Sequence, residues 1–323
     1  MKGYMIIDAH LHCFRSREAA KLALGAFPFF SDYTGTVDDA LTCIRKTAMT
    51  KAVMVNTIPL AYMRDSAVRK LPSDLTKEQR QEREKGIDET LLDRLVRLNA
   101  WSCEMGREHP ELVPTITLDP ILSAEALRRE VVDRVKNGGA KGIKLHPPIG
   151  RYYPNDERLW PAYQAASDMG IPVVFHCGPH PHPDDPKVTV EYSRPRHYEP
   201  LVERFPKLPV ILGHMGVGPG PDWKALIEPY YQEVLALAKK GYPNLHLDAS
   251  ECVSDAMGGH GLSDDQIVEL IRAIGPDHVL FGSDFPVYDP AIVIGKIMSY
   301  PFTDKEKRLI LGENCVALFR VNI

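Results

Sequence analysis

The chain has 323 residues, with 39 Lys and Arg against 43 Asp and Glu, so its formal net charge is -4. Hydrophobic residues make up 44% of the sequence and charged residues 25%, which is ordinary for a globular protein. A mildly acidic chain lacks the clustered basic face that nucleic-acid backbones require, and no apolar run reaches the ~18 residues that a membrane-spanning helix needs. The composition leaves one domain or two open, but it argues against nucleic-acid and membrane partners.

The six cysteines lie tens of residues apart, and no two have the CxxC spacing. In a chain of this length the pattern is not that of a disulfide framework, and reduced thiols are the simpler interpretation. The N-terminal sequence MKGYMIIDAHLHC has no long apolar segment ahead of its polar motif, so we expect no secretory signal. These features predict a cytoplasmic protein.

Eight short apolar runs rich in β-branched residues recur along the chain, separated by longer segments. Each run is nearly continuous in apolar character, as expected of strands that are buried on both faces of a parallel sheet. Eight strands alternating with helices predict a (β/α)8 TIM barrel or a doubly wound α/β sheet. The predicted strands cover residues 4–8, 52–57, 112–118, 140–145, 172–176, 209–213, 245–248 and 279–282.

Amphipathic segments at 88–108, 123–137 and 263–274 are predicted helices. Ser123 and Ser263 stand where N-cap residues are expected, because a side-chain oxygen at that position can accept a hydrogen bond from the first turn. The sequence shows no repeat, linker or low-complexity tail, so we expect a single domain over residues 1–323.

Two segments interrupt the regular alternation. Residues 59–86 follow the second strand and are highly charged, and residues 177–196 follow the fifth strand and are rich in Pro and His. Long loops within a compact domain are usually lids or binding loops, so we expect two inserted loops here. A solvated helix without a special role is the alternative for residues 59–86.

The motif DAHLH at the end of the first predicted strand carries the first chemical signal. Side chains alternate along a strand, so His10 and His12 point the same way and can share one cation. Asp8 faces the same way and could orient one of them through a hydrogen bond, with a structural role at the strand end as the alternative. Two structural histidines are the alternative, but each would need its own hydrogen-bond partners in a core.

Three further predicted strands end in the same kind of residue. His176 ends the fifth strand, His214 ends the sixth, and Asp284 follows the eighth. In a parallel barrel the carboxyl ends of all strands meet on one face, where active sites lie. Imidazole and carboxylate together are ligands for zinc or another borderline divalent ion. The sequence therefore predicts a divalent metal, most simply zinc, held among these strand ends.

Three other residues follow predicted strands and are candidates for substrate binding. His146 comes after the fourth strand and is expected to form part of the pocket wall. Arg151 lies slightly further on, where its guanidinium group could bind a carboxylate, with a surface loop as the alternative. Glu251 follows the seventh strand, and its position favours pocket lining.

The motifs DAHLH, GIKLHPP, FHCG, LGHMG and FGSDFP together resemble those of the amidohydrolase superfamily, and most closely its amidohydrolase-related branch, called amidohydrolase 2. The resemblance covers nearly the whole chain. It implies a (β/α)8 barrel of the metal-dependent hydrolase type. That branch contains lactone and amide hydrolases as well as decarboxylases, so the resemblance is specific for the superfamily and weak for the substrate.

Carried over residue by residue, the resemblance implies that His10, His12, His176 and Asp284 are metal ligands. His214 matches the histidine that is a catalytic acid/base or substrate contact in members with one metal, and a ligand in members with two. Lys144 falls at the strand where many members have a carboxylated lysine that bridges two metals. An uncarboxylated lysine paired near the site is the alternative, and the number of metals stays open.

These residues predict an enzyme that hydrolyses a small amide, lactone or ester-like bond with a metal-activated water, whose proton Asp284 accepts while His214 assists the leaving group. The alternative is a metal-dependent decarboxylase, a lyase acting on a small carboxylic or phenolic acid, because both reactions need the same ligands. A metal-storing barrel is a third and poorer interpretation. The expected partner is a small-molecule substrate, and the resemblance makes a homodimer the candidate assembly.

Overall fold

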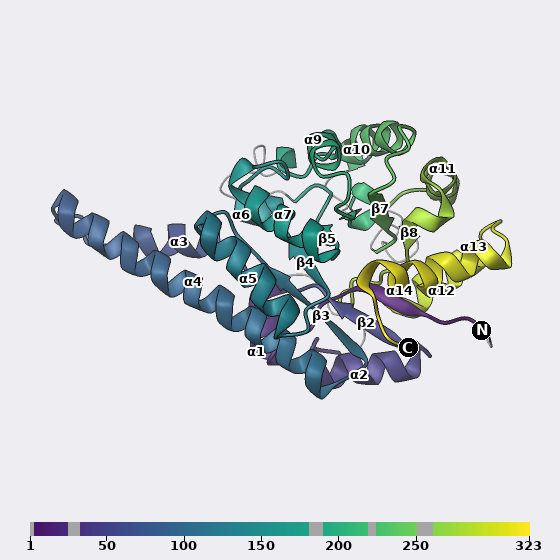
Figure 1. Ribbon diagram of the computed structural model, residues 1–323, viewed down its shortest axis with the longest axis horizontal. Coiled ribbons are helices and arrows are strands. Elements are labelled where there is room, and N and C mark those ends of the chain that lie inside the picture. The colour runs from purple at the N-terminus through teal and green to yellow at the C-terminus, as the bar shows by residue number, and fades with distance from the viewer. Residues whose placement is uncertain (1–2, 25–32, 181–189, 219–223, 251–260) are drawn as a thin grey trace.

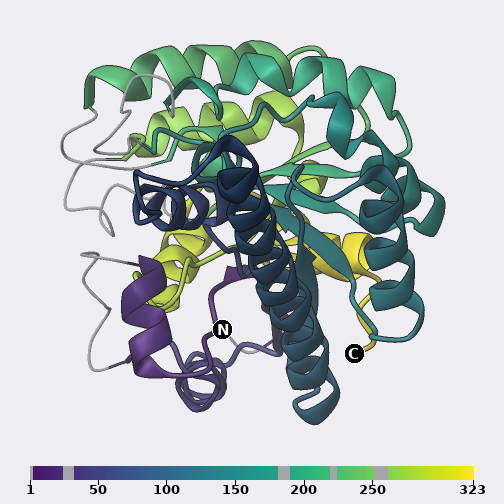
Figure 2. The same ribbon diagram turned by 90° about the vertical axis from the view of Figure 1, so that its left-hand side faces the viewer.

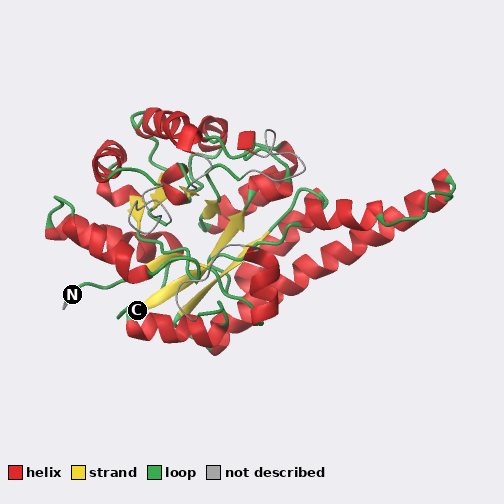
Figure 3. Ribbon diagram, turned by 180° about the vertical axis from the view of Figure 1, so that it is seen from behind, coloured by secondary structure: helices red, strands yellow, loops and turns green. Residues whose placement is uncertain are grey.

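The computed structural model describes residues 3–24, 33–180, 190–218, 224–250 and 261–323. In this part of the chain eight parallel strands follow one another around one sheet in the order of the sequence, and helices cover its outside (Figure 1, Figure 3). The strands are β1 (Ile7–Leu11), β2 (Lys51–Met54), β3 (Leu112–Thr117), β4 (Gly142–Leu145), β5 (Val173–Phe175), β6 (Val210–Leu212), β7 (Leu245–Asp248) and β8 (Val279–Leu280).

The sheet closes between β8 and β1. Ala9 N donates to Phe281 O at 2.8 Å, and His12 N donates to Phe285 O at the same distance. Leu11 and Phe285 form a further parallel bridge just beyond β8. The predicted (β/α)8 barrel is therefore confirmed, and the doubly wound sheet, which would leave two open edges, is wrong.

Residues 8–11 of the DAHLH motif lie within β1 and His12 follows it, because β1 begins and ends three residues later than predicted. The register of β1 against β2 shifts between Asp8 and Leu11. At this irregularity His10 N donates to the carboxylate of Asp8 at 2.9 Å instead of to a neighbouring strand. Asp8 therefore satisfies the backbone of His10, which agrees with the structural role that the sequence left open and not with orientation of an imidazole ring.

Helices surround the strands on all sides in the view of Figure 2. The predicted N-caps are confirmed, because Ser123 Oγ accepts from Ala126 N and Ser263 Oγ accepts from Gln266 N, each at 3.2 Å. The helices are α1 (Arg17–Leu24), α2 (Val37–Lys46), α3 (Leu60–Arg69), α4 (Lys77–Glu108), α5 (Ala124–Lys136), α6 (Pro147–Gly150), α7 (Trp160–Met169), α9 (Glu199–Arg204), α10 (Lys224–Ala238), α11 (Asp264–Ile274), α12 (Pro290–Ser299), α13 (Asp304–Arg308) and α14 (Asn314–Phe319).

Residues 59–86 are not the inserted loop that their charge suggested. They form α3, a short turn and the first ten residues of α4, so the prediction of a loop is wrong. A capping box at Thr76 begins α4, and Arg64 of α3 pairs with Asp88 of α4 at 2.6 Å and with Glu84 at 3.3 Å. Charged residues that are good helix formers favour a solvent-exposed helix as much as a loop, and these ion pairs hold α3 against α4.

Helix α4 is long enough to project beyond the barrel. Its 32 residues span about 48 Å at 1.5 Å per residue, and its N-terminal half extends past the barrel together with α3 (Figure 1). Of the second predicted loop, at 177–196, residues 181–189 lie outside the described residues. Of the helices described, none combines the length and apolar character required to cross a membrane.

The core has two parts. A large apolar cluster includes side chains of the helices and of the strands that they cover. A smaller cluster contains Val53, Val174 and Ile211 together with Phe319 of α14. Val174 is the register partner of both Ile211 and Lys144, so these three side chains point to the same side of the sheet. The smaller cluster therefore packs on the side of the sheet that carries the polar site.

Two glycines of α4 provide a matched test of how this helix packs. A Cβ on Gly106 would lie 2.5 Å from Cδ of Pro114 in β3, whereas a Cβ on Gly86 would meet nothing within 4 Å. We expect Gly106→Ala to lower the free energy of unfolding by about 1–3 kcal/mol through overpacking. Gly86→Ala should raise it by about 0.5–1 kcal/mol because alanine favours the helix.

Urea denaturation followed by circular dichroism measures both variants against the parent protein. Opposite signs for the same substitution in one helix are the expected result. Equal stabilisation by both would mean that α4 does not press on β3 at Gly106.

Candidate metal centre

His10, His12 and Asp284 meet where β1 and the segment after β8 lie side by side. His12 Nε2 lies 3.1 Å from Asp284 Oδ1, and His10 Nε2 lies 3.5 Å from the same oxygen. Their three candidate ligand atoms fall within 4.8 Å of one another. His10 is fully buried, and the side chain of His12 is 13% exposed. The structure thus brings together three of the four predicted ligands.

Backbone geometry aims two of the site residues. Asp284 and His214 have positive φ angles of 60° and 57°, which for residues other than glycine cost about 1–3 kcal/mol and need support from their surroundings. Asp284 N donates to His10 O at 2.8 Å, so the strained residue is fastened directly to β1. Ser283 beside it donates from N to Asp8 at 3.0 Å. These contacts fix where the Asp284 carboxylate points.

Asp248 at the end of β7 is a site residue that sequence reasoning missed. Its Oδ2 accepts from His10 Nδ1 at 2.8 Å, and its Oδ1 accepts from the backbone N of His214 and of Ser250, each at 3.1 Å. Burial alone would raise the pKa of Asp248, but the hydrogen bond from His10 holds it below its usual value. Histidines that ligate metals usually donate their second nitrogen to such a carboxylate.

His214 lies between two other polar side chains. Its Nδ1 is 3.0 Å from Ser250 Oγ, and its Nε2 is 3.0 Å from His176 Nδ1. Burial lowers the pKa of His214 to about 3, so the ring is neutral at pH 7. With Asp248 accepting from its backbone, His214 is held among the strand ends, and its role as a catalytic or ligand histidine stays a prediction.

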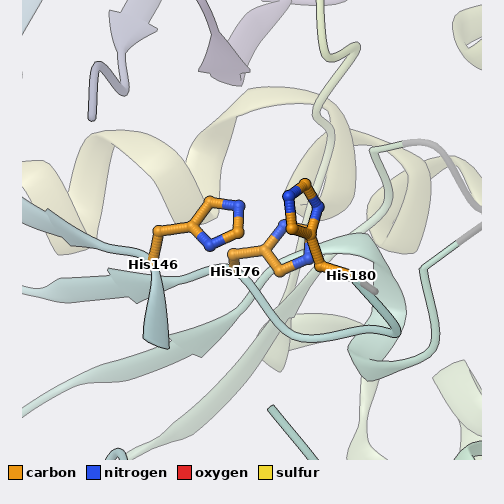
Figure 4. Close-up of side chains that lie close together, drawn as sticks. All are labelled: His146, His176 and His180. Atoms are coloured by element: carbon orange, nitrogen blue, oxygen red, sulfur yellow. The ribbon is translucent and has the colours of Figure 1, made fainter. Parts of the chain in front are cut away.

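His176, the fourth predicted ligand, belongs to a second group. Candidate ligand atoms of His146, His176 and His180 lie within 4.8 Å of one another, and the three side chains gather at the ends of β4 and β5 (Figure 4). His176 contacts the first group through His214 alone among the contacts described. The four residues that the resemblance joined around one ion are therefore divided between two neighbouring groups.

Lys144 occupies the inside of the barrel with almost no exposure. Its Nζ lies 3.1 Å from His10 Nε2, the nitrogen that would bind a metal. The lysine therefore lies at the site, as predicted. Its carboxylation stays a prediction.

The predicted substrate-binding residues have different outcomes. His146 stacks on His176 with ring centroids 4.0 Å apart and lines a small pocket with Asp119 and Tyr152. Arg151 forms an ion pair with Asp65 of α3 and lies over the ring of Tyr62, so its guanidinium group helps to hold α3. Glu251 lies outside the described residues.

The donor set fits a divalent ion. Burial and the charge of Lys144 lower the pKa of His10, and the His12 hydrogen bond holds the pKa of Asp284 below its usual value although burial opposes this. Neutral imidazoles and an ionised carboxylate are the forms that bind metals. His176 Nε2 is buried and has no hydrogen-bond partner among the described residues, which a metal would also satisfy.

A (β/α)8 barrel whose strand ends gather imidazoles and carboxylates has the architecture of a metal-dependent barrel enzyme. Residues 7–321 match the Amidohydrolase family, and the chain belongs to this family, as its motifs indicated. A comparison with curated proteins found no match.

Several solved structures share the fold. The 5-carboxyvanillate decarboxylase of Sphingomonas paucimobilis has a TM-score of 0.65 and 16% identity, covering 99% of this chain and 100% of that one. The 2,6-dihydroxybenzoate decarboxylase of Rhizobium has a TM-score of 0.66 and 17% identity, covering 99% of each chain. A dihydroxybenzoic acid decarboxylase of Polaromonas, solved with manganese and 2-nitroresorcinol, has a TM-score of 0.67 and 15% identity, covering 100% of this chain and 98% of that one.

Asp119 offers a test of buried charge at the pocket. Burial raises its pKa to about 6, so the folded chain binds this proton more tightly than the unfolded chain. Stability should therefore fall as the pH rises from about 4 to about 6 and stay lowered above that range. We expect Asp119→Asn to stabilise the protein at pH 8 by up to about 3 kcal/mol and to gain little at pH 4. Thermal unfolding of both proteins at both pH values measures this difference. The same change in stability at pH 4 and at pH 8 would contradict the prediction.

Asp248→Asn tests whether the buried carboxylate orients His10. An asparagine side chain keeps the shape of the aspartate, but it has no negative charge and only one of its two terminal atoms can accept a hydrogen bond. The affinity for a divalent ion should therefore fall by about 10–100-fold. Competition against a chelator measures the affinity. Asp277→Asn is the matched control, because Asp277 is 67% exposed just before β8. Equal affinities in the two variants would exclude the orienting role.

Proposed function

We propose that the protein is a metal-dependent decarboxylase that removes carbon dioxide from a small hydroxylated aromatic acid. The observation that carries the proposal is the meeting of His10, His12 and Asp284 at one end of the barrel. Support comes from three decarboxylases of aromatic acids that share the fold. Hydrolysis, the main prediction from the sequence, would use the same residues. We favour it less because these three structural neighbours are decarboxylases.

His10, His12 and Asp284 would hold the ion, and manganese or zinc would suit these ligands. When bound, the ion supplies positive charge that stabilises the oxygen atoms of the substrate. His10 is held for this role by the hydrogen bond from its Nδ1 to Asp248, which leaves Nε2 facing the site.

Asp284 is the residue that we assign to proton transfer. Its depressed pKa makes it an anion in the resting protein, so it accepts the proton of the substrate hydroxyl. The same proton then passes to the ring carbon that bears the carboxylate. The carbon–carbon bond breaks, its electron pair returns to the ring, and carbon dioxide leaves. The oxygen of the product regains a proton from water.

His214 has a supporting part in this proposal. Because burial lowers its pKa to about 3, His214 neither takes up nor releases a proton readily at pH 7, but its neutral ring can form hydrogen bonds. Its contacts to Ser250 and His176 hold the ring beside His10, where the ring centroids are 4.8 Å apart. We assign His214 to orienting the substrate, with the proton supplied by Asp284.

The cellular setting is part of the same proposal. A small-molecule substrate, a cytoplasmic location and a homodimer are the expectations that the sequence raises. Five cysteines of the described chain are buried and unpaired, which suits a reducing compartment. They are Cys13, Cys43, Cys103, Cys177 and Cys315.

A substrate panel tests the reaction. Protein loaded with manganese or zinc is mixed with 2,6-dihydroxybenzoate, 5-carboxyvanillate and 2-hydroxybenzoate, and carbon dioxide and the phenolic product are measured together. We expect equal amounts of both from at least one acid. Asp284→Asn should lower kcat by at least about 100-fold because the proton carrier is lost. Asp277→Asn should keep the parent rate.

The metal content of each sample is measured in parallel. If the metal-loaded protein releases no carbon dioxide from any acid but cleaves a lactone or amide panel, the proposal is wrong and the hydrolase interpretation is correct. If Asp284→Asn keeps its rate, the assignment of the proton carrier is wrong.

A further inference from the structure

His146 directly follows β4 and begins the short helix α6. This helix opens with Pro147 and Pro148, which have no backbone N–H, so Ile149 carries the first free donor of the turn. His146 Nδ1 accepts from Ile149 N at 3.4 Å, and His146 O accepts from Gly150 N at 3.1 Å. The side chain of His146 is therefore the N-cap of α6.

This cap decides which nitrogen of the imidazole carries the proton. A ring nitrogen that accepts from a backbone N–H bears no proton itself, so the ring is neutral and its single N–H is on the other nitrogen. His146 therefore presents an Nε2–H group, which can donate a hydrogen bond but cannot accept one. Among the residues that the structure describes, none accepts from this N–H, so it is available to a bound molecule.

The ring of His146 lies beside the candidate metal ligand His176. Their ring centroids are 4.0 Å apart and the rings are nearly parallel, with an interplanar angle of 6°. In Figure 4 the His146 ring points toward His176 and His180. No carboxylate of the described chain belongs to the group that these three histidines form. An anionic oxygen that enters here would meet a hydrogen-bond donor and no acidic member of this group.

We propose that His146 binds the substrate, by donating a hydrogen bond from Nε2–H to a carboxylate oxygen of the acid. This inference rests on the proposed decarboxylase function, in which Asp284 takes the proton of the substrate hydroxyl and leaves the carboxylate in need of its own donor. The phenolic product has lost that carboxylate, so the bond is made to the substrate and not to the product. His146 would therefore distinguish the acid from the phenol.

The energetics of this hydrogen bond predict how its loss would change the kinetics. A hydrogen bond to a charged group contributes enough that its loss lowers affinity by about 10–100-fold. As the carboxylate leaves as carbon dioxide, its electron pair returns to the ring, so the bond is stronger in the bound acid than in the transition state. Loss of the donor should therefore raise KM much more than it lowers kcat.

Two substitutions separate the donor from the cap. His146→Asn keeps an oxygen that can accept from Ile149 N, but it has no group at the position of Nε2. His146→Gln carries an amide N–H nearer to that position, but it leaves α6 without its cap. We expect His146→Asn to keep the thermal unfolding midpoint and to lose affinity for the acid by about 10–100-fold. His146→Gln should unfold at a lower temperature and lose less than about tenfold in affinity.

The acid is 2,6-dihydroxybenzoate, and the reference is resorcinol, the same ring without the carboxylate. If the metal-loaded protein releases carbon dioxide, initial rates give KM and kcat, and inhibition by resorcinol gives the affinity for the product. If it releases none, the acid stays intact and calorimetry measures the binding of both compounds. A failure of the proposed reaction therefore does not prevent the test of His146.

His146→Asn should bind resorcinol as tightly as the parent protein does. His109→Asn is the matched control and should keep the parent affinity for both compounds, because His109 precedes β3 and so lies at the opposite end of the barrel. Three results would overturn the inference: no binding of the acid by the parent protein, parent affinity for the acid in His146→Asn, or an equal loss for acid and resorcinol. If His146→Gln does not fold, His146→Asn alone decides.

A second readout needs no substrate. Nuclear magnetic resonance of protein labelled with nitrogen-15 histidine distinguishes a ring protonated on Nε2 from one protonated on Nδ1, and the signals of His146 are those that disappear in His146→Asn. We expect the proton on Nε2 in the parent protein. A proton on Nδ1 would show that the cap is absent and that the donor is not available, whatever the protein does to the acid.

Discussion

The buried carboxylate of Asp248 is the contact on which the polar end of this barrel depends. It accepts hydrogen bonds from the ring of His10 and from the backbone of His214 and Ser250, so one side chain ties β1, β6 and β7 together. An isolated carboxylate in this setting would cost several kcal/mol of desolvation, which these donors offset. The position of the anion therefore sets the direction of the His10 ring and fixes the backbone at His214.

Barrel closure places the remaining groups. The hydrogen bonds between β1 and the segment after β8 put Asp284 next to His10 and His12, although more than 270 residues separate them in the sequence. The irregularity of β1 at Asp8 belongs to the same junction, because Asp8 accepts from the backbone of both His10 and Ser283. The same contacts thus close the sheet and position the site. A substitution that weakens the junction between β1 and the segment after β8 would also move His10, His12 and Asp284 apart.

The sequence was sufficient to predict the barrel and the end of it that carries the site. Eight apolar runs and polar residues at their ends report directly on a parallel sheet, since the pattern follows from burial on both faces. Prediction from the sequence failed where the residue types are compatible with more than one structure. The charged stretch before Gly86 suits a loop or an exposed helix, and only its pairing with α3 decides. Asp248 was missed although it ends β7 and so obeys the same strand-end rule.

The grouping of the histidines could not be predicted, because it depends on side-chain direction across several strands. His176 was expected beside His10, but its ring stacks on His146, and His214 stands between them. Strand position fixes the end of the barrel at which a residue lies. It does not fix the neighbour that the ring faces, which is decided by side-chain rotation and by competing hydrogen bonds.

Lys144 shows that the polar end must rearrange when it binds an ion. Its Nζ lies against His10 Nε2, and a metal ion needs the same nitrogen. Two cations cannot share that position, because their repulsion is strong where water is excluded. Metal binding therefore requires the Lys144 side chain to move from His10 or to lose its charge.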